Sequence, residues 1–83
     1  MTIVNVVGAQ VRKLRKEQKL TQEQLSARCN VIGLDISRGT LAKIEAGVRQ
    51  VIDTEIVQLA TALKVEEKDL FPRRTDRINT ALY

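Results

Sequence analysis

A short stretch of basic and small residues, 37–47, carries the clearest candidate chemistry in this chain. It reads Ser-Arg-Gly-Thr-Leu-Ala-Lys-Ile-Glu-Ala-Gly. Arg38 and Lys43 are cations whose N–H groups can donate hydrogen bonds to the O6 and N7 acceptors of guanine. Gly39 lies between them and adds no bulk. The stretch predicts a helix that enters the major groove of DNA, and the alternative is an ordinary amphipathic helix with a solvated polar face.

Local signals predict that this stretch is helical over about residues 37–46. Ser37 is a good N-cap, because its hydroxyl can accept a hydrogen bond from a free backbone N–H of the first turn. Leu41 and Ile44 lie three residues apart and therefore share one face, which we expect to be buried. Gly47 is a natural stop, since glycine adopts the left-handed conformation without a Cβ penalty.

Length and composition predict one small all-α domain. The chain has 83 residues, one proline and a net charge of +4, and its apolar residues recur at helical spacing. Residues 1–49 hold nine basic and four acidic residues, whereas residues 50–72 hold two basic and five acidic ones. A basic first half favours an anionic partner on one side. We expect the DNA-binding domain to span 1–72 and the tail, 73–83, to be disordered or packed on a second subunit.

Several functional classes are disfavoured by the residues present. Cys29 is the only cysteine and there is no histidine, so we expect no disulfide, no structural zinc site and no cofactor. Acid–base catalysis would require perturbed carboxylates or lysines, and no phosphate-cradling Gly-rich loop is present, so we expect no enzyme. No apolar run reaches the length of a membrane span, and the start lacks a signal-peptide pattern. We therefore expect a cytoplasmic protein with Cys29 in its core.

Two further helices are predicted before the 37–47 stretch. Asn5 can cap a helix that begins near Val6 and runs to about Gln18. Thr21 and Gln24 have the spacing of a capping box, which predicts a second helix over 22–29. The first turn of that helix carries free N–H groups beside Gln22, and such a helix N-terminus favours an anion such as a DNA phosphate.

Two helices are predicted after the 37–47 stretch, which makes five in all. Asp53 is the N-cap candidate for a helix that continues to about Lys64. A last short helix is expected over 66–71, with Leu70 and Phe71 closing the core.

Four stretches, taken together and in order, resemble the phage-repressor-like, Xre-type family of helix-turn-helix DNA-binding domains. The resemblance implies a compact five-helix bundle with a lambda-repressor-like fold, in which the third helix reads DNA. It covers most of residues 8–71. The matching stretches are residues 11–15, 20–25, 37–47 and 59–71.

The resemblance also implies roles for individual residues. Gln22, first in the second helix, would bind a DNA phosphate, and Arg49 and Gln50 would contact the DNA backbone just beyond the third helix. Arg15 and Glu45 match a pair that joins the first helix to the third in this family. The residues at or near the groove would be Ser37, Arg38, Gly39, Thr40 and Lys43.

Two features depart from the family pattern. The connector over 30–36 is roughly five residues longer than the usual tight turn. It could tilt the recognition helix or extend the second helix toward Gly33. Gly39 stands where the family often has a base-reading side chain, so direct readout would fall on its neighbours. The connector could also offer apolar side chains to a protein partner, namely Val31, Ile32 and Leu34.

The sequence therefore predicts a sequence-specific DNA-binding transcriptional regulator, most simply a repressor. One small domain covers only a few base pairs, so we expect a homodimer on a palindromic operator. The alternative is a protein-interaction module on the same fold, such as an antitoxin or phage-type regulator that acts through a protein partner.

Overall fold

Four α-helices and one 3₁₀ turn make up the described part of the chain. The computed structural model describes residues 3–72, so the predicted tail, 73–83, lies outside the described residues. The prediction of an all-helical domain is confirmed, but the prediction of five helices is wrong because the last element is only a 3₁₀ turn. The elements are α1 (Gly8–Glu17), α2 (Gln22–Val31), α3 (Arg38–Glu45), α4 (Asp53–Leu63) and the 3₁₀ turn η1 (Glu67–Leu70).

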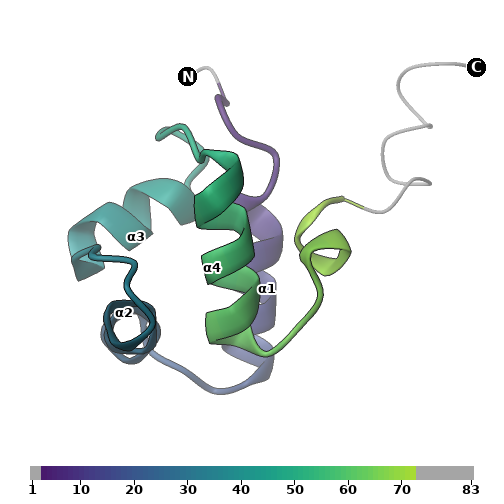
Figure 1. Cartoon of the computed structure of the whole chain (residues 1–83). Coiled ribbons are helices and arrows are strands. Elements are labelled where there is room, and N and C mark those ends of the chain that lie inside the picture. The colour runs from purple at the N-terminus through teal and green to yellow at the C-terminus, as the bar shows by residue number, and fades with distance from the viewer. Residues whose placement is uncertain (1–2, 73–83) are drawn as a thin grey trace, which may run out of the picture.

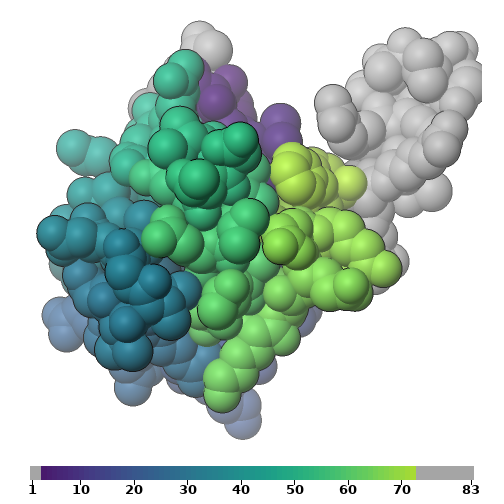
Figure 2. All heavy atoms as spheres, viewed as in Figure 1, coloured from purple at the N-terminus to yellow at the C-terminus, as the bar shows by residue number. Residues whose placement is uncertain are grey.

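The helices surround one apolar core. α1 packs against α3 and α4, α2 packs against the same two helices, and η1 closes over α1 and α4. Figure 1 shows α2 nearly end-on beneath α3, with α4 crossing in front of α1. In the space-filling view, α4 separates the α2–α3 side from η1 (Figure 2). The fully buried large side chains are Val7, Val11, Leu25, Cys29, Leu41, Ile44, Leu59, Leu63 and Leu70.

Val7, and not Asn5, occupies the cap position of α1, and the helix begins at Gly8 rather than near Val6; the Asn5 side chain nevertheless accepts from the first free amides. Its Oδ1 accepts hydrogen bonds from the backbone N–H groups of Val7 (3.0 Å) and Gly8 (2.7 Å). Its Nδ2 donates to the carbonyl oxygens of Ile44 (3.1 Å) and Arg49 (2.8 Å). One side chain therefore starts α1 and holds the end of α3 and the following loop against it.

The connector between α2 and α3 is shorter than the sequence indicates, because α2 runs two residues past its predicted end. Gly33 then adopts φ +96°, as expected of a residue that ends a helix. Leu34 is only 7% exposed and belongs to the core. The prediction that Leu34 is free to bind a partner is therefore wrong: once α2 ends, this side chain is the first that turns inward.

The start of α4 differs from prediction. Ile52, and not Asp53, occupies the cap position. The Glu55 carboxylate accepts the Ile52 backbone N–H at 3.1 Å, so the free amide at the cap is satisfied from inside the helix.

The predicted helix over 66–71 reduces to one turn, because Phe71 is already extended ahead of Pro72. A residue before proline is disfavoured in the α conformation. Leu70 is fully buried, as predicted, but the Phe71 side chain is 40% exposed. The prediction that both residues close the core therefore holds for Leu70 alone.

Candidate nucleic-acid interface

α3 exposes the basic side chains that the sequence singled out. Ser37 caps the helix as predicted: its Oγ accepts the Thr40 backbone N–H at 3.1 Å and donates to the Thr40 hydroxyl at 3.1 Å. Leu41 and Ile44 are fully buried, which fixes the inward face of the helix. The outward residues are Ser37, Arg38, Gly39 and Lys43, with Thr40 half-buried beside them.

The N-terminus of α2 is open to an incoming anion. Thr21 and Gln24 form the predicted capping box, in which the Thr21 hydroxyl accepts from the Gln24 N–H (3.0 Å) and the Gln24 amide oxygen accepts from the Thr21 N–H (2.8 Å). The first intrahelical bond is donated by Leu25. The amides of Gln22 and Glu23 precede it, so they lie at the positive end of the helix dipole.

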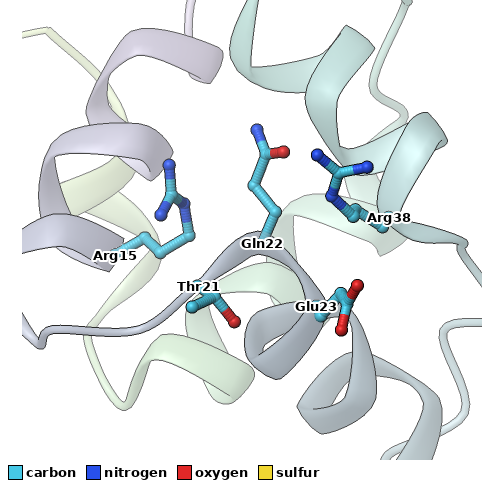
Figure 3. A pocket seen from close by; sticks show the side chains of 5 residues that line it. All are labelled: Arg15, Thr21, Gln22, Glu23 and Arg38. Atoms are coloured by element: carbon cyan, nitrogen blue, oxygen red, sulfur yellow. The ribbon is translucent and has the colours of Figure 1, made fainter.

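A hollow of about 450 Å³ joins the α2 N-terminus to the start of α3. Figure 3 shows Gln22 between Arg15 of α1 and Arg38 of α3, with Thr21 and Glu23 below it. The Arg15 guanidinium is neutralised by the Glu45 carboxylate, so Arg38 and the positive end of the α2 dipole are the groups that favour an anion here, beside the carboxylate of Glu23. Such an arrangement can hold an anion by charge and by directed N–H groups.

Arg15 and Glu45 form the ion pair that the family resemblance implied, and this pair is buried. Arg15 Nε and one terminal nitrogen donate to the two Glu45 oxygens at 2.7 and 3.0 Å, and the two side chains are 10% and 2% exposed. The other terminal nitrogen of Arg15 donates to the Leu20 carbonyl at 2.7 Å. The pair therefore ties α1, α3 and the α1–α2 turn together.

Arg49 and Gln50 lie at the other end of α3, about 12 Å along the helix axis from its first turn. Gln50 is exposed. The Arg49 guanidinium is held by Glu55, with contacts of 2.9 and 3.1 Å to the two carboxylate oxygens. The hydrogen bonds from Arg49 keep the pKa of the Glu55 carboxyl below its ordinary value of 4.5. This pair braces the loop between α3 and α4.

The stabilisation by the Arg49–Glu55 ion pair should depend on pH. A carboxyl whose pKa is lowered by folding stabilises the fold above its ordinary pKa, and that contribution disappears as the pH falls through the lowered value. Glu55→Gln should therefore reduce the melting temperature near pH 7. The gap to the unchanged protein should close as the pH falls below the ordinary pKa of 4.5. Thermal unfolding followed by circular dichroism measures it, and a gap that stays constant with pH would contradict the assignment.

Cys29 is fully buried in the core, as predicted, and burial raises the pKa of its thiol to about 11, which keeps it protonated and unreactive. Within residues 3–72, no three carboxylate or thiol side chains gather where a metal ion could bind. None of the helices described has the length and apolar content needed to span a bilayer.

Sequence reasoning missed one part of this site. Gln22 Nε2 donates to the Glu45 carboxylate at 3.1 Å, so the candidate anion ligand is attached to the buried pair. The two residues are 23 positions apart, and no local spacing signals such a contact.

Comparisons with known proteins agree with this geometry. A helix-turn-helix family model matches residues 11–70. The restriction-modification controller protein C.AhdI from Aeromonas hydrophila is 34% identical, with a TM-score of 0.69 over 78% of this chain and 87% of that one. A hypothetical transcription factor, NHTF, from Neisseria shares the fold at 20% identity, with a TM-score of 0.73 over 94% of this chain and 84% of that one. A comparison with curated protein sequences gave no match.

The family match spans most of the chain and contains α2, α3 and the hollow between them. The family model and the 34% identity to a controller protein show that the chain resembles this family in sequence as well as in fold. The chain belongs to the Xre-type, lambda-repressor-like helix-turn-helix family of DNA-binding regulators.

Proposed function

We propose that this protein is a sequence-specific transcriptional repressor that reads the major groove with α3. The observation that carries the proposal is the position of Arg38, which lies both on the exposed face of α3 and beside the open N-terminus of α2. A helix of this length fits the major groove, and the α2 N-terminus then faces the flanking phosphates. Bound protein would block polymerase by occupying the promoter.

In this proposal, base reading and phosphate binding fall on different residues. Arg38, Thr40 and Lys43 read base edges, while Gly39 lets the backbone approach the bases closely. Gln22 and the Ser37 end of α3 contact phosphate. Arg49 and Gln50 contact the backbone at the other end of α3, with the Arg49 guanidinium already oriented by Glu55.

A homodimer on a palindromic operator completes the proposal, because one domain covers only a few base pairs. An apolar surface supports a dimer: Ile3, Val4 and Val6 are 60%, 45% and 48% exposed. They line a hollow of about 340 Å³ together with Val51, Ile56 and Phe71. Apolar area of this kind is suited to a partner subunit.

Arg38→Ala gives the test of base reading. We expect it to cost about 1–3 kcal/mol of binding free energy on the preferred duplex and to relax the base preference, because a bidentate contact to guanine is lost. Fluorescence anisotropy with the preferred duplex and with single-base variants measures both. Lys68→Ala, which removes the same charge from η1, is the control. A loss equal on all sequences would mean that Arg38 contacts phosphate only.

A second candidate function, binding of a protein partner, is favoured by the end of α2. Val31 is 85% exposed and Ile32 is 37% exposed. An isoleucine and a valine side by side at a helix end can form a small docking surface. This function would use the same fold, as in an antitoxin or a phage-type regulator.

Val31→Asp separates the two roles. We expect it to weaken self-association or partner binding while leaving the melting temperature within about 4 °C of the unchanged protein, since an exposed substitution rarely alters stability by more than about 0.5 kcal/mol. Sedimentation equilibrium and thermal unfolding provide the readouts. Leu34→Asp, at a buried position, is the unfolding control. A Val31→Asp protein that unfolds would assign the residue to the core instead.

A further inference from the structure

The Glu45 carboxylate is a meeting point of the three helices that build the interface. Its two oxygens accept from Arg15 of α1, and Oε1 also accepts from Gln22 of α2. Glu45 itself is the last residue of α3. Its side chain is only 2% exposed, so the two hydrogen bonds from Arg15 are buried, where they are stronger than on the surface. The hydrogen bond from Gln22 is part-buried at the edge of this site.

This contact fixes the orientation of the Gln22 amide. An ionised carboxylate can only accept hydrogen bonds, so the NH₂ side of the amide must face Glu45 and the amide oxygen must face away. Figure 3 shows the side chain of Gln22 extended between Arg15 and Arg38, with its oxygen on the Arg38 side. One of the two hydrogens on Nε2 is used by Glu45, and the other remains available to a ligand.

We infer that Glu45 is a positioning residue for DNA binding and acts through Gln22. This inference rests on the proposed function, in which Gln22 donates to a DNA phosphate. An amide free to rotate would present its oxygen to the phosphate about as readily as its nitrogen, and it would lose rotamer freedom on binding. Glu45 holds the amide in one rotamer before DNA arrives, with the second Nε2 hydrogen left for the phosphate, and the bidentate contact with Arg15 holds the carboxylate still.

A double-mutant cycle on DNA affinity tests the inference. Glu45→Gln should weaken binding to the preferred duplex roughly 3- to 10-fold, the range of one hydrogen bond. In the Gln22→Ala background the same change should alter the dissociation constant less than about twofold. An equal loss in both backgrounds would overturn the inference. All four proteins are measured at a temperature where circular dichroism shows each to be fully folded.

A second readout requires neither DNA nor a folded Glu45 variant. In the ¹⁵N-labelled protein, the side-chain NH₂ of Gln22, assigned by its disappearance in Gln22→Ala, should show one proton shifted downfield and slowed in exchange. The exposed Gln50 amide is the reference. Chemical shifts and exchange rates of the Gln22 protons that match those of Gln50 would overturn the inference. If the protein binds no duplex more tightly than it binds random DNA, the proposed function is refuted. The NMR result still reports whether Glu45 holds the Gln22 amide, because that measurement does not involve DNA.

Discussion

Glu45→Ala is expected to lower the free energy of unfolding by about 3–5 kcal/mol, because it leaves the Arg15 guanidinium buried without its counter-charge. Arg15 would keep only its hydrogen bond to the Leu20 carbonyl. Gln22 would lose its acceptor as well. Urea unfolding at constant pH measures the loss as a shift in the midpoint with an unchanged slope.

The matched control replaces both partners. A buried ion pair exchanged for apolar side chains of similar volume is often neutral or stabilising, since two desolvation penalties are removed together. Arg15→Met combined with Glu45→Leu should therefore recover most of the stability that Glu45→Ala loses. A single Glu45→Ala variant within about 1 kcal/mol of the unchanged protein would show that the pair is hydrated and structurally unimportant.

Gly8→Ala is expected to destabilise the fold by about 1–3 kcal/mol, although alanine is the better helix former. A Cβ at this position would lie 1.9 Å from the Ile44 carbonyl oxygen and 3.1 Å from Asn5 Oδ1. Both are parts of the junction that holds α1 against the end of α3. The atoms that clash include backbone, so the helices themselves must move apart.

Gly39→Ala is the control for this prediction. Gly39 is also helical, but the nearest atom to an added Cβ is Ser37 Oγ at 3.8 Å, an ordinary contact. Alanine should therefore leave the fold unchanged or stabilise it by up to about 1 kcal/mol. Thermal unfolding of the two variants side by side gives the comparison. Equal melting temperatures for Gly8→Ala and Gly39→Ala would contradict the packing argument.

The sequence predicted those parts of the fold that depend on near neighbours. Thr21 and Ser37 cap their helices as expected, because each hydroxyl reaches an amide three residues on. Gly33 and Gly47 take the positive φ values, 96° and 79°, that end α2 and α3. Arg15 and Glu45 were paired only through the family resemblance, since no local rule joins residues 30 positions apart.

What the sequence did not predict depends on tertiary contacts. Whether Leu34 faces a partner or the core is decided by where α2 ends against α4, and the last element shortens because Phe71 must extend before Pro72. The Gln22 contact with Glu45 requires α2 and α3 to be docked first. The predicted DNA contacts remain predictions, although Gln22 and Arg38 do line one hollow.

Selection of bound duplexes from a random-sequence pool, with the full chain as bait, tests the central claim most directly. The account predicts a palindrome with half-sites about one helical turn apart, some 34–36 Å. It also predicts that this palindrome binds at least about 10³-fold more tightly than random DNA at the same salt concentration. No enriched sequence, with only weak and steeply salt-dependent binding, would contradict a sequence-specific regulator and favour the protein-partner function.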